Sequence, residues 1–138
     1  MKAKASTSKA RRRILYVESH DDSREMLAEM LSYAGYEVAT TTNVADGLGL
    51  ARLEGFDLYI LGSRFSDGTG IDLCRQIRGF DPGTAIIFFS SAAYASDVKA
   101  GMAAGAQHYL VKPAGIYAIE QTIAGVFAEA PEAWAYSL

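Results

Sequence analysis

The stretch DLYILGSRFSDGTG, residues 57–70, decides the fold of this chain. It begins with a continuous apolar run of strand length and ends in a Gly- and Ser-rich segment that predicts a loop. A strand that is apolar on both faces is typical of a parallel sheet covered by helices on both sides. Such sheets carry their functional groups beyond the carboxyl ends of the strands, and the residue at that end here is Gly62. The chain therefore has a residue without a side chain where chemistry is expected.

Four further segments are also expected to be strands, mostly as continuous apolar runs, and amphipathic segments separate them. The five expected strands are RILYVE (13–18), YEVATT (36–41), DLYILG (57–62), AIIFFSS (85–91) and HYLVK (108–112). The expected helices cover residues 21–35, 43–55, 70–80, 96–106 and 116–127. The helix over 96–106 is the weakest, because Gly101 lowers its helix propensity by about 1 kcal/mol.

Strands that alternate with helices in this way predict an α/β fold of the (βα)5 type. Because crossovers between parallel strands are right-handed, few doubly wound topologies remain, and we expect the flavodoxin-like strand order 2-1-3-4-5 in a five-stranded parallel sheet. This order opens a crevice at the carboxyl ends of the first and third strands. The residues expected at this edge are Glu18, Ser19, Gly62, Ser90, Ser91 and Lys112.

The length and the charge of the chain divide it into three parts. With 138 residues, it is long enough for one domain with its own core and too short for two. Six of the 13 Lys and Arg residues lie within residues 1–13, and none of the 16 Asp and Glu residues does. We predict a flexible basic arm over 1–12, a folded domain over 13–128 and a tail over 129–138. The arm is either a contact for nucleic acid or a solvated leader, and the lack of interleaved aromatic residues favours the leader.

The cysteine and histidine content gives no sign of redox or metal chemistry. Cys74 is the one cysteine, which rules out an internal disulfide and fits a reducing compartment. No stretch reaches the length of a signal-peptide core or a membrane span, so we expect a cytoplasmic protein. His20 and His108 have no paired His or Cys at metal-ligand spacing, and we interpret them as surface or hydrogen-bonding histidines.

Several blocks of this sequence resemble the receiver domain of two-component response regulators. They are RILYVESHDDSREML, FDLYILGSRFSDGTGIDLCRQIR, AIIFFSSAA and AGAQHYLVKP, in this order within residues 13–128. In that family two acids end the first strand, an aspartate ends the third, Ser or Thr ends the fourth and Lys-Pro follows the fifth. The resemblance implies that the aspartate accepts a phosphoryl group from a histidine kinase, with Mg²⁺ held by the acids. By position, Glu18 matches the first acid and Lys112 the lysine, while Ser90 and Tyr109 match the two switch residues.

Ser19 and Gly62 depart from the family pattern. Phosphoryl transfer to this site needs a carboxylate nucleophile and a bridging cation, and Gly62 supplies no nucleophile. Mg²⁺ prefers hard, usually charged oxygen ligands, and Ser19 offers a neutral hydroxyl where the resemblance implies a carboxylate ligand. We therefore expect no phosphorylation, no catalytic residue, no metal or other cofactor and no enzymatic activity. Glu18 and Lys112 remain as one charge of each sign, and we predict a direct or water-bridged ion pair between them.

These departures indicate a pseudo-receiver that signals by protein contact, independently of phosphorylation. Its partner is expected to be a histidine kinase or a downstream signalling protein, and homodimer formation stays open. The alternative is a non-covalent sensor of a small anion or ligand, in the pocket that the missing aspartate vacates around Lys112. DNA binding through the arm is weaker, because no helix-turn-helix or other reader motif is present.

Overall fold

A computed structural model describes the backbone of residues 11–137 and the side chains of residues 11–128. The described chain contains one parallel sheet built from five strands: β1 (Arg13–Val17), β2 (Glu37–Thr41), β3 (Leu58–Leu61), β6 (Ala85–Ser90) and β7 (His108–Val111). Their order in the sheet is β2-β1-β3-β6-β7, which confirms the predicted flavodoxin-like order. Both ends of each strand lie within one residue of the predicted bounds.

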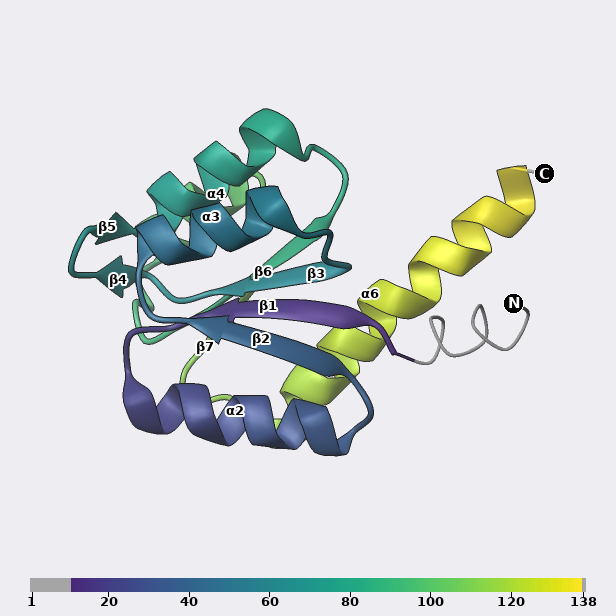
Figure 1. Cartoon of the computed structure of the whole chain (residues 1–138), viewed down its shortest axis with the longest axis horizontal. Helices are drawn as coiled ribbons and strands as arrows, with labels where there is room; N and C mark the ends of the chain where they lie inside the picture. The colour runs from purple at the N-terminus through teal and green to yellow at the C-terminus, as the bar shows by residue number, and fades with distance from the viewer. Residues whose placement is uncertain (1–10, 138) are drawn as a thin grey trace.

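Helices cover both faces of this sheet (Figure 1). They are α2 (Asp21–Tyr33), α3 (Val44–Leu53), α4 (Gly70–Phe80), α5 (Ala95–Ala104) and α6 (Ile116–Ser137). One apolar core joins the sheet to α3, α4 and α5, and a second joins it to α2 and α6. The fold is therefore doubly wound, as the continuous apolar runs predict.

The central strands are buried on both faces because their side chains alternate between the two cores. In β1, Leu15 and Val17 belong to the first core, whereas Ile14 and Tyr16 belong to the second. All four side chains are fully buried. The edge strand β2 shows only exposed or intermediate positions, so it follows the pattern of a sheet border.

Polar side chains and glycines stand at several of the helix ends. Asn43 caps α3 by accepting from the backbone N–H of Asp46, as its sequence position predicts. Thr69 caps α4 in the same way. Gly35 follows the C-cap residue Ala34 of α2 with φ of 104°, a left-handed conformation that favours glycine.

Two elements differ from the sequence-based expectation. The segment expected to be a plain loop contains a short antiparallel hairpin, β4 (Arg64–Phe65) and β5 (Gly68–Thr69). Asp67 lies in the turn of this hairpin. Its carboxylate accepts hydrogen bonds from the backbone N–H groups of Val44 and Ala45 at 2.9 Å each, and these bonds connect the hairpin to the start of α3. These hydrogen bonds lower the pKa of the Asp67 carboxyl group.

The second difference concerns α6, which continues from the predicted end at residue 127 to Ser137. The added segment contains four Ala residues, which have a high helix propensity, and also Pro131, which does not. Most of the basic arm predicted over 1–12 lies outside the described residues. Within residues 11–137, none of the helices combines the length and the hydrophobicity that a membrane span requires.

Candidate functional site

An open cavity of about 930 Å³ lies at the carboxyl ends of the strands. Among the residues that line it are five of those predicted at this edge: Glu18, Ser19, Ser90, Ser91 and Lys112. They come from the ends of β1, β6 and β7, which parallel pairing brings to one edge of the sheet. The predicted crevice is therefore where the strand order puts it.

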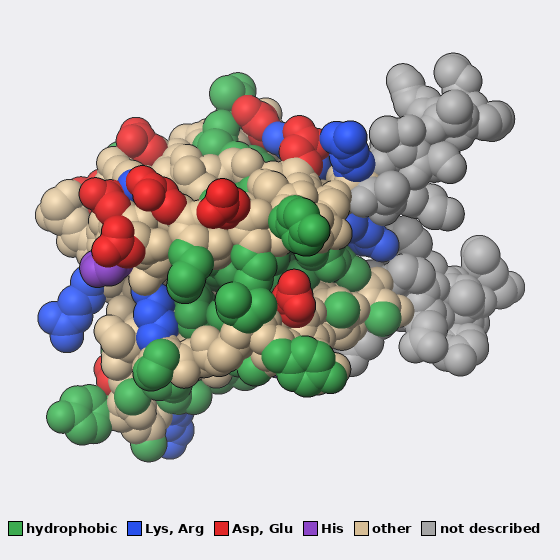
Figure 2. Space-filling view, turned by 90° about the horizontal axis from the view of Figure 1, so that it is seen from below, with side chains coloured by type: hydrophobic (Ala, Val, Ile, Leu, Met, Phe, Trp, Pro, Cys, Tyr) green, Lys and Arg blue, Asp and Glu red, His purple; other side chains and the backbone are tan. Residues whose placement is uncertain are grey.

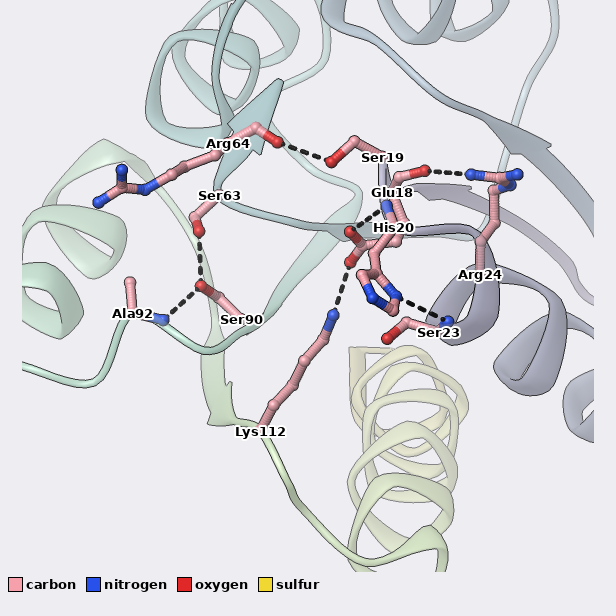
Figure 3. A network of polar contacts seen from close by, with 10 residues as sticks. All are labelled: Glu18, Ser19, His20, Ser23, Arg24, Ser63, Arg64, Ser90, Ala92 and Lys112. Carbon is pink, nitrogen blue, oxygen red and sulfur yellow. Dashed lines mark hydrogen bonds and ion pairs between the residues drawn. The ribbon is translucent and has the colours of Figure 1, made fainter. Parts of the chain in front are cut away.

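Glu18 and Lys112 form the centre of this site (Figure 3). The Lys112 ammonium group donates to Glu18 Oε1 at 2.9 Å, and the backbone N–H of His20 donates to Oε2 at 3.0 Å. Glu18 is 5% exposed, so little water competes for its carboxylate. The predicted direct ion pair is confirmed, and it links two residues that are 94 positions apart.

Gly62 lies directly behind this carboxylate and is itself buried. A Cβ atom built on Gly62 would lie 3.0 Å from Glu18 Oε1 and 3.3 Å from Glu18 Cδ. The Glu18 carboxylate therefore occupies the space directly at position 62, while the cavity lined by Lys112 stays open. Glutamate is one methylene longer than aspartate, and its carboxylate reaches the place that a side chain at position 62 would enter.

Ser19 and the backbone of Arg64 close the adjoining part of the cavity. The Ser19 hydroxyl donates to the Arg64 carbonyl oxygen at 3.0 Å, which satisfies both groups within the protein. Asp97, a further carboxylate that lines the cavity, accepts from the backbone N–H of Tyr94 at 3.0 Å.

The oxygen atoms of this site do not fit the ligand set of a Mg²⁺ ion. Mg²⁺ prefers several hard, charged oxygen ligands in octahedral geometry, whereas the carboxylate beside Gly62 is already bound to an ammonium group. Among the described residues, no three His, Cys, Asp or Glu side chains gather closely enough to hold a metal ion.

Two serines meet at the floor of the cavity. Ser63 Oγ and Ser90 Oγ lie 2.6 Å apart in a hydrogen bond, and Ser90 Oγ also accepts from the backbone N–H of Ala92 at 2.9 Å. Ser90 is 2% exposed. Sequence reasoning missed Ser63, although its place directly after Gly62 at the end of the third strand was an available signal.

Tyr109 is held beneath the segment that follows β6. Its hydroxyl donates to the Ala92 carbonyl oxygen at 2.8 Å, and its ring stacks on Phe88 with centroids 5.4 Å apart. A Cβ atom on Gly101 would lie 2.9 Å from the Tyr109 ring, so the glycine in α5 provides the space for this ring. Ser90 and Tyr109 therefore contact the same residue, Ala92, one through its N–H and one through its carbonyl.

His20 has a structural place at the rim of the cavity. It is the N-cap of α2, and its Nδ1 accepts from the backbone N–H of Ser23 at 3.3 Å. Arg24 of the same helix donates to the Glu18 carbonyl oxygen at 2.9 Å. The interpretation of His20 as a hydrogen-bonding histidine is confirmed.

Comparison with known proteins agrees with this fold. The family model for the response regulator receiver domain matches residues 14–124. The chain belongs to this family. A CheY-like receiver domain protein from Methanospirillum hungatei shares the fold with a TM-score of 0.85 and 24% identity, over 88% of this chain and 98% of that one. The non-phosphorylated HemR receiver domain from Leptospira biflexa aligns with a TM-score of 0.80 and 28% identity, over 85% of this chain and 94% of that one.

Curated relatives are longer than this chain. The nisin biosynthesis regulatory protein NisR of Lactococcus lactis is 31% identical over 114 residues, which cover 83% of this chain and 48% of NisR. Response regulator MprA of Mycobacterium tuberculosis is 31% identical over 112 residues, which cover 81% of this chain and 47% of MprA. The chain thus spans about half the length of the curated relatives that it matches.

Proposed function

We propose that this receiver domain is a pseudo-receiver, which passes a signal by protein contact and is not phosphorylated. The observation that carries the proposal is the Glu18–Lys112 ion pair beside Gly62. Formation of an acyl phosphate requires a carboxylate oxygen free to attack phosphorus, and cations that balance the charge of the phosphoryl group. Residue 62 has no side-chain oxygen, and the lysine that would balance this charge is bound to Glu18.

The proposal includes one fixed arrangement of the switch residues Ser90 and Tyr109. The Ser63–Ser90 hydrogen bond gives the Ser90 hydroxyl a partner within the protein. Ala92 bonds to both switch residues, so that movement of either one breaks a hydrogen bond at the same place. Without a covalent trigger, a change of arrangement requires a partner that binds the two arrangements with different affinities.

The proposed partner is a histidine kinase or a downstream signalling protein of the cytoplasm, and we propose no contact with nucleic acid or membrane. Exposed apolar side chains on α5 and α6 suit a protein contact: Tyr94 just before α5, Met102 on α5, and Ile116 and Tyr117 on α6. Figure 2 shows the face that α2 and α6 form, where hydrophobic side chains gather across the middle; Ile116 and Tyr117 belong to α6, whereas Tyr94 and Met102 do not belong to this face. Contiguous apolar surface of this kind favours protein association.

Treatment with acetyl phosphate and Mg²⁺, followed by intact mass spectrometry, tests the absence of phosphorylation. We expect no gain of about 80 Da, the mass of one phosphoryl group. A receiver that retains the aspartate, treated in parallel, is the positive control. Binding of a candidate partner with and without the phosphodonor completes the test, and a dependence on the donor would contradict the proposal.

A second candidate is a non-covalent sensor of a small ligand. The size of the cavity favours it, because about 930 Å³ lies within the range of small-molecule sites. The internal pairing of Lys112, Ser90 and Ser19 speaks against an anion, since a ligand would have to displace these contacts. Isothermal titration calorimetry with inorganic phosphate tests the anion-binding form of this candidate, because an anion sensor gives a binding heat and a module that acts by protein contact alone does not.

A further inference from the structure

We propose that Ser63 holds the two switch residues, Ser90 and Tyr109, in their one arrangement. This inference rests on the proposed function and names how its fixed arrangement is kept. A hydroxyl group at the end of β3 binds Ser90 and, through Ser90, the segment that contacts Tyr109. Ser63 is thus a positioning residue, because it acts on Tyr109 through other residues.

The backbone of Ser63 is fixed where β3 leaves the sheet. The Ser63 carbonyl oxygen accepts from the backbone N–H of Gly70 at 2.9 Å, which closes the base of the β4–β5 hairpin. A Cβ atom on Gly70 would overlap the Gly62 carbonyl oxygen, so the two glycine backbones pack directly against each other. The N–H of Gly62 donates to the Val17 carbonyl oxygen at 2.9 Å. The reach of the Ser63 hydroxyl is therefore set by its backbone.

Ser63 and Ser90 share a short hydrogen bond in a place that water scarcely reaches. Their Oγ atoms lie 2.6 Å apart, and Ser90 is 2% exposed. A serine hydroxyl has one proton to donate and two lone pairs that accept, and Ser90 Oγ already accepts from the backbone N–H of Ala92 at 2.9 Å. Whichever hydroxyl donates, the bond to Ser63 selects the rotamer of Ser90 in which its oxygen faces Ala92.

Ala92 carries this restraint to β7. Figure 3 shows Ser63, Ser90 and Ala92 joined in sequence by two hydrogen bonds. The carbonyl oxygen of Ala92 accepts from the Tyr109 hydroxyl at 2.8 Å. Ala92 is therefore held through its N–H on one side and holds Tyr109 through its carbonyl on the other.

The Tyr109 ring needs this hydrogen bond because packing does not fill the space around it. A cavity of about 420 Å³ adjoins the ring, and its other lining residues include Ser63, Phe65, Ile71 and Ala92. A ring that borders open space has room for a second position. The bond from its hydroxyl to Ala92 therefore supplies a part of the restraint that close packing does not.

Loss of the Ser63 hydroxyl should release the chain of contacts at its first member. Buried polar groups are almost always hydrogen-bonded, so the Ser90 hydroxyl would turn towards another partner. Its oxygen would then leave the N–H of Ala92, and the carbonyl that binds Tyr109 would move with the same residue.

Fluorine NMR of the chain labelled with 3-fluorotyrosine tests this effect. Tyr109→Phe identifies the Tyr109 signal by its disappearance, and circular dichroism shows whether each variant is folded. We expect Ser63→Ala to shift this signal in the same direction as Ser90→Ala and at least half as far. Ser66→Ala is the matched control, because Ser66 lies exposed in the turn of the same hairpin. A Tyr109 signal in Ser63→Ala that coincides with the wild-type signal would overturn the inference.

Two further variants distinguish positioning through Ser90 from a local disturbance. Ser63→Thr keeps a hydroxyl at this place, and we expect it to leave the Tyr109 signal near its wild-type position. In the double variant Ser63→Ala/Ser90→Ala, the signal should coincide with that of Ser90→Ala alone, because Ser63 acts through Ser90. Shifts that add in the double variant would contradict this order of contacts.

Hydrogen exchange of the Ala92 amide measures the middle of the chain of contacts. We expect this amide to exchange at least tenfold faster in Ser63→Ala than in the wild type, while the amides of β3 keep their rates. Acceleration of both to the same extent would reflect a general loss of stability and would count against the inference.

These outcomes separate the inference from the proposed function. An unchanged Tyr109 signal in Ser63→Ala overturns the role of Ser63 and leaves the proposed function intact, because signalling by contact does not depend on which residue holds the pair. Phosphoryl uptake by the wild-type chain contradicts the proposed function, and the NMR comparison still decides the role of Ser63.

Discussion

At the scale of single residues, the chemistry of this pocket depends on which atoms Glu18 contacts. The carboxylate is paired with Lys112, is almost completely buried and lies against the backbone of Gly62. A buried pair of this kind is not a strong source of stability, because desolvation offsets much of the attraction. It is nevertheless sensitive to the loss of one partner, which leaves an isolated charge out of water.

Replacing Lys112 by Met should therefore destabilise the domain. We expect a loss of about 3–5 kcal/mol in the free energy of unfolding, because the Glu18 carboxylate keeps its burial and loses its counter-ion. The double variant E18Q/K112M should recover a large part of this loss. Urea denaturation measures both, with Lys99→Met at an exposed position as the control. A Lys112→Met effect no larger than that of the control would show that the pair is energetically irrelevant.

At the scale of elements, α5 shows why a weak helix is retained. Gly101 reduces the helix propensity of α5, yet a Cβ atom at this position would lie within about 3 Å of the Tyr109 and Phe88 rings. The same ring reaches the Ala92 carbonyl oxygen just before α5. The glycine that lowers the helix propensity of α5 is therefore also the residue that leaves space for the Tyr109 ring on β7.

Gly101→Ala should destabilise the domain by about 1–3 kcal/mol, as overpacking does, although alanine is the better helix former. The added methyl group would meet the Tyr109 ring at 2.9 Å. Gly49→Ala in α3 is the control, and it should raise stability by about 0.5–1 kcal/mol because the space around it is open. Urea unfolding gives the two values, and near-ultraviolet circular dichroism reports displacement of the Tyr109 ring. A gain of stability in both variants would remove the proposed packing role of Gly101.

At the scale of the whole molecule, two apolar cores share one sheet. The inner strands β1 and β3 contribute fully buried side chains to both cores, whereas the border strands β2 and β7 contain no buried position among their described residues. Opening of a border strand therefore exposes much less apolar surface than opening of an inner strand.

Amide hydrogen exchange should follow this division. We expect amides of β1 and β3 to exchange only with global unfolding, and those of β2 and β7 to exchange faster by local opening. Exchange followed by nuclear magnetic resonance at several low urea concentrations measures the free energy of each opening. Protection of β7 equal to that of β1 would mean that the border strands belong to the same cooperative unit.

Sequence by itself determined the layers of this protein and the absence of a side chain at its centre. Continuous apolar runs gave the strands to within one residue, and the order of the strands brought Glu18 and Lys112 to one edge, where their pairing could be predicted. Hydrophobic periodicity is a local property, so a single chain contains enough information to predict it.

Only the tertiary structure decided how the pocket is filled. The place of the Glu18 carboxylate in front of Gly62, the Ser63–Ser90 hydrogen bond and the fit of Tyr109 against Gly101 all join segments that are distant in the sequence. These contacts depend on differences of a few tenths of an ångström, because repulsion between atoms rises steeply below about 3.5 Å. No pattern of residue types carries distances of that size, so these contacts are visible only in the folded chain.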